Sequence, residues 1–185
     1  MMTPEERFAA KSLWKFFYAQ QCFTHVVNTC AFILQNGIGE DHPAYYSLVV
    51  GIYALYGRPF TDTNVVGMIS EKLVPAEFRP FHKIMIELRN EVYAHSEPGG
   101  RNEVRVRVSY KRGSKEGRLV LNEFFSRLPA LAKIIELCQA MQTTMDRKIA
   151  ELQNRHFPQH LPREPGEYPI NVSDPAGPFF LPKQS

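Results

Sequence analysis

The sequence predicts a mainly α-helical bundle of four to five helices, with a β-hairpin inserted before the last long helix and an extended, proline-rich C-terminal tail. Apolar residues recur at helical spacing through most of the first 98 residues and again after residue 122. Between these regions, over residues 101–122, the spacing alternates as it does in paired strands. Seven of the 14 prolines fall in the last 29 residues, and this density excludes helices and central strands there. We expect a helical domain over residues 1–156 and a tail over residues 157–185.

The first predicted helix begins after Thr3 and ends before Asn36-Gly37. Thr3 is a favourable N-cap, Pro4 suits the first helical position, and Glu6 completes a capping box. Its aromatic cluster consists of Trp14, Phe16, Phe17 and Tyr18. Because these residues occupy more than one face, the helix must be covered on several sides, by neighbouring helices or by a second subunit.

The second predicted helix runs from Pro43 to Gly57, where glycine and the nearby proline end it. Thr63 or Asn64 is then expected to cap a short third helix that ends near Leu73.

A longer helix should begin near Pro80 and stop at Pro98-Gly99-Gly100. The last helix follows from Glu123, and Pro129 should either split off its first turn or kink it.

The predicted hairpin pairs residues 104–110 with residues 118–122. Valines alternate with charged residues in the first segment, and Gly113 and Gly117 suit the turn. A lone hairpin is only marginally stable in water, so its apolar face is expected to lie on the helices or on a partner.

The composition points to an ordinary globular protein, with 44% hydrophobic and 22% charged residues among 185. No apolar run approaches the roughly 18 residues of a membrane helix, and acidic residues near the N-terminus do not suit a secretory signal. We therefore expect a cytoplasmic protein that does not contact membranes. Cys22, Cys30 and Cys138 form no CxxC pair, so buried thiols are expected.

Metal and cofactor sites are not indicated. The sequence has no phosphate loop, dinucleotide glycine signature or HExxH motif. Of the six histidines, His156 and His160 lie four residues apart, but Pro158 separates them. We expect no metal and no cofactor.

One constellation of residues suggests chemistry, and it lies at the end of the helix that precedes the hairpin. The segment 87–96 reads Glu-Leu-Arg-Asn-Glu-Val-Tyr-Ala-His-Ser and contains Arg89, Asn90 and His95. Here the chain resembles the HEPN superfamily (higher eukaryotes and prokaryotes nucleotide-binding), whose members carry a phrase close to LRNxxxAH after such a helix. The resemblance covers about residues 45–97 in detail, including the stretches 56–61 and 82–83.

The resemblance implies a small helical bundle that dimerises and brings the Arg–His motifs of two subunits to one cleft. Many members are metal-independent endoribonucleases, often toxins or phage-defence effectors, which implies an antitoxin or another partner protein. Other members have lost catalysis and bind RNA, nucleotides or proteins.

These residue types suit RNA cleavage, because RNA supplies the 2′-OH as its own nucleophile. His95 would move protons near neutral pH, and Arg89 would stabilise the charge that gathers on the phosphate. Asn90 would hold a phosphate oxygen or fix the imidazole. Six positions along an α-helix place Arg89 and His95 roughly 120° apart around the axis. Either the helix loosens near Ala94-His95, or the two groups converge across a dimer cleft.

The motif also has a purely structural interpretation. A histidine at a helix C-terminus is favourable because its cation opposes the helix dipole. In that case Arg89 and Asn90 would be a solvated surface pair.

The hairpin concentrates positive charge. Residues 101–118 hold seven basic and two acidic residues, a net charge of +5 in a chain of net charge +3. Such a hairpin can follow the phosphate backbone of single-stranded RNA, or it can be an edge that charge protects from aggregation. The candidate RNA-binding residues are Arg101, Arg105, Arg107, Lys111 and Arg112.

Two other classes of function remain open. In one, the aromatic first helix and the proline-rich tail serve a non-catalytic dimerisation or protein-interaction module. In the other, the chain is a nucleotide-binding accessory subunit.

Overall fold

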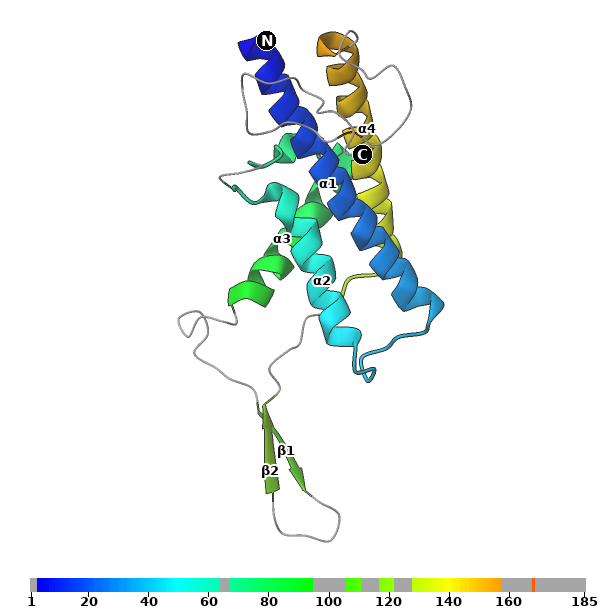
Figure 1. The fold of residues 1–185 in the computed structure, drawn as a ribbon. Helices are drawn as coiled ribbons and strands as arrows, with labels where there is room; N and C mark the ends of the chain where they lie inside the picture. Colours follow the sequence, from blue (N-terminus) through cyan, green and yellow to red (C-terminus); the bar gives the residue numbers. More distant parts are fainter. Residues whose placement is uncertain are drawn as a thin grey trace.

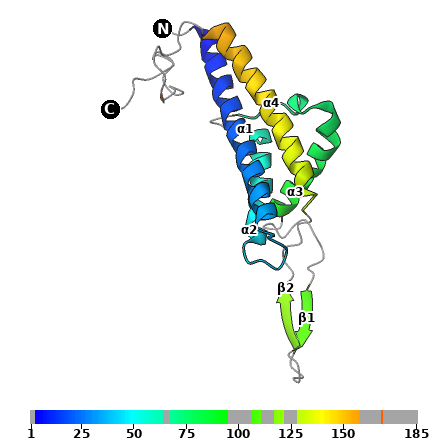
Figure 2. The same ribbon diagram turned by 90° about the vertical axis from the view of Figure 1, so that its right-hand side faces the viewer.

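Four α-helices form the folded body in this computed structural model (Figure 1), which describes residues 3–63, 67–94, 106–110, 117–121, 128–157 and 168. They are α1 (Pro4–Gln35), α2 (Tyr45–Gly57), α3 (Arg79–Ala94) and α4 (Leu131–His156). The long helices α1 and α4 lie side by side and antiparallel in both Figure 1 and Figure 2. Helix α2 packs against α1, and α3 packs against α2. The prediction of a mainly α protein is confirmed.

Helix α1 begins as the sequence predicts. The Thr3 hydroxyl accepts a hydrogen bond from the Glu6 backbone N–H at 3.2 Å, and the Glu6 carboxylate accepts one from the Thr3 backbone N–H at 2.7 Å. The two bonds form the capping box. The helix ends at Gln35, and Gly37 follows with φ +57°, a left-handed conformation that glycine adopts at little cost.

The predicted short helix ending near Leu73 is wrong for the described part of that segment. Only the 3₁₀ turn η2 (Glu71–Leu73) forms there. Ser70 caps it, because its hydroxyl accepts a hydrogen bond from the Lys72 N–H at 3.2 Å. Gly67 has φ +72° and is not helical, and Pro75 disfavours a helical conformation at Val74, which is extended. Residues 64–66, which include one of the two predicted caps, lie outside the described residues.

Other helix boundaries differ by a few residues. Helix α2 begins at Tyr45, two residues after Pro43, and α4 begins at Leu131, after Pro129. Pro129 therefore precedes α4 and does not kink it. The predicted stop at residues 98–100 and the predicted start at Glu123 lie outside the described residues.

The hairpin forms from β1 (Val106–Tyr110) and β2 (Gly117–Leu121), which pair antiparallel. The register sets Val106 opposite Leu121 and Val108 opposite Leu119. Figures 1 and 2 both show the backbone of the two strands extending away from the helices. Packing of the apolar face on the helices stays a prediction, because the side chains of the strands are not among those described. Coverage by a partner stays a prediction.

The core has two parts. The larger lies between all four helices and includes the fully buried Phe23, Tyr53, Tyr56 and Met85. The smaller joins the start of α1 to the end of α4, and its members are Ala9, Ala10, Leu13, Ile149 and Phe157. Phe157 is 1% exposed, so at this residue the predicted tail does lie on the domain.

The three cysteines are buried, as predicted. Burial raises the pKa of the Cys30 thiol to about 12 and also raises the pKa of Cys138. These thiols therefore stay protonated at neutral pH and serve the packing of the core.

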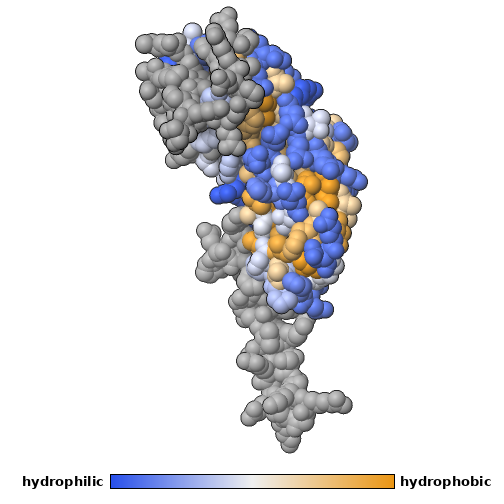
Figure 3. Space-filling view, turned by 45° about the vertical axis from the view of Figure 1, so that its right-hand side comes forward, coloured by the Kyte–Doolittle hydropathy of each residue, from blue (hydrophilic) through white to orange (hydrophobic). Residues whose placement is uncertain are grey.

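The surface of α1 is only partly covered. Its aromatic cluster is half-buried, whereas Phe8, Phe32 and Leu34 are exposed. Figure 3 shows apolar areas reaching the surface between hydrophilic ones on the visible face. No described helix combines the length and the apolar character needed to cross a bilayer.

Candidate functional site

Arg89 occupies the second half of α3, where it packs against the end of α2. Its Nη2 donates a hydrogen bond to the Thr61 hydroxyl at 3.0 Å, and its Nη1 donates one to the Asn90 side-chain oxygen at 2.9 Å. Arg89 is half-buried, and Asn90 is exposed. Two neutral acceptors from different parts of the chain thus fix the direction of the guanidinium.

Gly57 provides the space that Arg89 occupies. A Cβ atom built on Gly57 would lie 2.8 Å from Cγ of Arg89 and 3.1 Å from its Cδ, closer than atoms normally approach. The backbone of Gly57 has φ −77° and ψ −21°, a conformation open to any residue. Glycine is therefore needed here for its lack of a side chain.

Two hydrogen bonds within its own turn orient Thr61. It directly follows the 3₁₀ turn η1 (Arg58–Phe60), and its N–H donates to the Arg58 carbonyl at 3.1 Å. Its hydroxyl donates to the Gly57 carbonyl at 3.0 Å. Because a hydroxyl has one donor, its lone pairs are then directed to accept from Arg89.

The structure pairs Asn90 with Arg89, as the structural interpretation of the motif has it. Its side-chain oxygen accepts from the neighbouring Arg89, so it helps to orient the guanidinium. Its amide nitrogen is a donor of the kind that a phosphate oxygen would accept.

A buried histidine lies beside this arrangement. His82 is 5% exposed, its Nδ1 is 2.7 Å from the Tyr56 hydroxyl, and its ring centroid is 4.5 Å from that of Phe60. The Glu71 carboxylate is 3.9 Å from its Nε2. Burial lowers the pKa of His82, and Glu71 offsets part of this effect. His82 thus ties α3 to the turn that carries Thr61.

The sequence held a signal for this residue. His82 and Arg89 are seven positions apart, which places them on one face of a helix. Both therefore meet the end of α2, and the contact to Tyr56 and Phe60 follows from that crossing. The spacing does not identify Tyr56 as the partner of His82, because Tyr56 is 26 residues away in the sequence.

His82 should make the stability of the fold depend on pH. Its ordinary pKa is 6.5, and its folded pKa is lower. Below about pH 6.5 the unfolded chain therefore takes up the proton first, and the free energy of unfolding falls until the pH reaches the folded pKa. Urea unfolding between pH 5 and 8 should show this decrease in wild type and a smaller one in His82→Gln. An equal decrease in both proteins would contradict it, and His25→Gln, on an exposed position, is the control.

The other predicted site residues are not brought together by the described structure. His95, Arg101, Arg105, Lys111 and Arg112 lie outside the described residues. Arg107 lies in β1, where its backbone is paired opposite Val120. Helix α3 ends at Ala94, one residue before His95. The part of the chain that is described therefore tests only the placement of Arg89 and Asn90.

Among the described residues, no group of three or more histidine, cysteine or acidic side chains could hold a metal ion. Comparison of the chain with protein-family models, curated proteins and solved structures found no match. The function is therefore argued from the residues of this chain.

Proposed function

We propose that this chain is a HEPN-like, RNA-binding protein that cleaves single-stranded RNA without a metal ion. Arg89, Asn90 and His95 are its catalytic residues. The observation that carries the proposal is the fixed guanidinium of Arg89, held by Thr61 and Asn90 six residues before His95. A cation positioned in advance is what stabilisation of a phosphoryl transition state requires, because it costs no reorganisation during the reaction.

The reaction needs only groups that the motif and the RNA supply. The 2′-oxygen attacks the adjacent phosphorus, the bond to the 5′-oxygen breaks, and a 2′,3′-cyclic phosphate and a 5′-hydroxyl result. His95 takes the proton of the 2′-OH or gives one to the leaving 5′-oxygen. Arg89 stabilises the charge on the non-bridging oxygens, and Asn90 keeps Arg89 in place. A homodimer would supply a second His95, so one imidazole could act as base and the other as acid.

The charge of the hairpin supports contact with RNA. The net charge of +5 over residues 101–118 follows the motif directly in the sequence. Lysine and arginine on a two-stranded ribbon neutralise phosphates and release counterions, so RNA binding should weaken steeply as salt increases. The proposed contacts are Arg101, Arg105, Arg107, Lys111 and Arg112.

The test is cleavage of a labelled single-stranded RNA in EDTA by wild type and by His95→Ala. We expect wild type to give products with 2′,3′-cyclic phosphate ends and His95→Ala to give none above the buffer background. The same strand with 2′-deoxy sugars should resist cleavage, because the nucleophile is missing. His25→Ala, an exposed histidine on α1, is the matched control and should cleave like wild type. Equal cleavage by wild type and His95→Ala, or none by either, would refute the catalytic proposal.

A non-catalytic dimerisation module is the second candidate, and the exposed Phe32 and Leu34 on α1 favour it. Under this alternative, His95→Ala would lose folding or dimerisation and leave RNA affinity unchanged. Circular dichroism and sedimentation of the same variant therefore separate the two candidates.

A further inference from the structure

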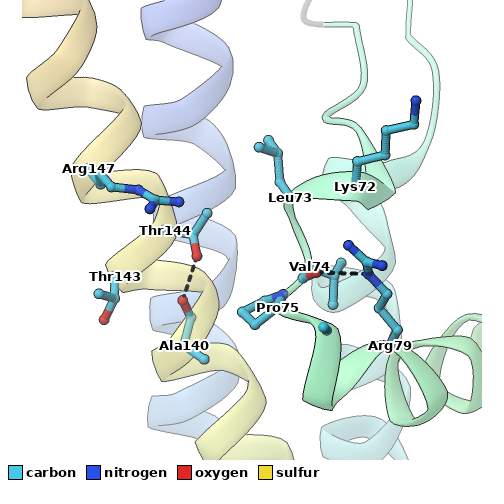
Figure 4. A pocket seen from close by; sticks show the side chains of 10 residues that line it. Lys72, Leu73, Val74, Pro75, Arg79, Ala140, Thr143, Thr144 and Arg147 are labelled. Carbon is cyan, nitrogen blue, oxygen red and sulfur yellow. Dashed lines mark hydrogen bonds between the residues drawn. The ribbon is translucent and has the colours of Figure 1, made fainter.

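A cavity of about 540 Å³ lies between α4 and the segment of residues 72–79, away from the motif (Figure 4). The segment of residues 72–79 contributes Lys72 and Arg79, and α4 contributes Arg147. The remaining lining residues are Leu73, Val74, Pro75, Ala76, Ala140, Thr143 and Thr144. In Figure 4 the Arg147 side chain reaches from α4 toward the segment, and Arg79 lies on the opposite wall, whereas the Lys72 side chain points away from α4. One arginine thus lies on each wall, and apolar side chains form much of the rest.

The charge around this cavity is positive. Among the described residues that line it, three are basic and none is acidic. On α4, the Oε1 atom of Glu151 lies 3.9 Å from Nε of the exposed Arg147. That pair is weak because water screens it, and the other oxygen of Glu151 accepts from Lys148 at 2.5 Å. Because this pair is weak, Arg147 can still contact another anion.

Arg79 is held in place on the opposite wall. Its Nε donates to the Val74 carbonyl at 3.3 Å, as the dashed line in Figure 4 shows. Arg79 is also the first residue of α3, where the helix dipole adds positive potential. The bond to Val74 restricts the side chain of Arg79 and leaves the two terminal nitrogens of its guanidinium to donate elsewhere.

We propose that this cavity binds a polyphosphate anion, either inorganic or the phosphate chain of a small nucleotide. Cations on two walls suit an extended chain of negative groups better than a single carboxylate does. The volume falls within the range of small-molecule sites and is too small for a protein segment of several turns. Arginine binds phosphate oxygens through paired donors.

This site is separate from the proposed catalytic one. Arg79 and Arg89 are ten residues apart on α3, which corresponds to about 15 Å along the helix axis. The inference therefore does not rest on RNA cleavage, and a protein without catalysis could still bind polyphosphate here.

Titration calorimetry with tripolyphosphate at low salt tests the proposal on the full chain. We expect wild type to bind one tripolyphosphate, and Arg79→Gln and Arg147→Gln each to weaken binding about tenfold, as loss of a charged contact does. The matched control is Arg155→Gln, an exposed arginine of α4 that does not line the cavity and should change nothing.

Absence of binding by wild type would overturn the proposal. So would an equal loss in Arg155→Gln, because the effect would then come from net charge alone. A second titration with ATP and AMP distinguishes the two sources. Binding of ATP but not AMP, with the same sensitivity to Arg147→Gln, supports a nucleotide as the ligand. Binding of tripolyphosphate alone supports an inorganic polyphosphate.

Discussion

Gly57→Ala should destabilise the protein, whereas Gly51→Ala should stabilise it, although both replace a glycine of α2 with the best helix former. At Gly51 nothing lies within 4 Å of the added Cβ, so the change should gain about 1 kcal/mol of helix propensity. At Gly57 the added Cβ meets Cγ of Arg89 at 2.8 Å. Such overpacking costs about 1–3 kcal/mol, because the clash falls near the base of the side chain, which cannot move away easily. The two variants should therefore differ by about 2–4 kcal/mol.

Urea unfolding of the two variants measures this difference directly. RNA cleavage in EDTA gives a second reading, because displacement of Arg89 from Thr61 should lower the rate about 100-fold in Gly57→Ala and leave Gly51→Ala unaffected. Equal stability of the two variants would show that Arg89 does not pack on Gly57. A stability difference without a change in cleavage would remove Arg89 from the reaction and leave the packing intact.

Phe23→Ala should lower the free energy of unfolding by about 3–5 kcal/mol, a large share of the stability of an ordinary domain. Phe23 is fully buried at the centre of the larger core, with its ring centroid 5.9 Å from that of Tyr56 and 6.2 Å from that of Phe60. Removing the ring leaves a cavity that the three surrounding helices cannot close. It also loosens the turn that presents Thr61 to Arg89.

The control for this variant is Phe8→Ala on the same helix. Phe8 is 75% exposed, so the same loss of atoms should change stability by less than about 0.5 kcal/mol. Chemical denaturation followed by circular dichroism measures both variants. Similar destabilisation by the two substitutions would mean that the position of Phe23 in the core is wrong, or that a second subunit covers Phe8.

The two residues of the candidate site that the structure describes were predictable, but most of what holds them was not. Arg89 and Asn90 are adjacent in the sequence, and their hydrogen bond is local. Thr61 lies 28 residues before Arg89. The resemblance includes the stretch 56–61, but no local pattern pairs Thr61 with Arg89. Gly57 looked like a helix stop, and it does end α2. Its second role as the surface against which Arg89 packs depends on how α3 crosses α2.

The sequence by itself determined the features that depend on near neighbours. The capping box at Thr3 and Glu6, the extent of α1 and the alternation in the hairpin are local, because turns and ladders close over a few residues. Tertiary structure decided the rest. It reduced the segment ending near Leu73 to a 3₁₀ turn, buried His82 against Tyr56, and set Arg79 across a cavity from Arg147. These outcomes depend on which helix faces meet, and that is set by the packing of the whole core, where each side chain has neighbours from distant parts of the chain.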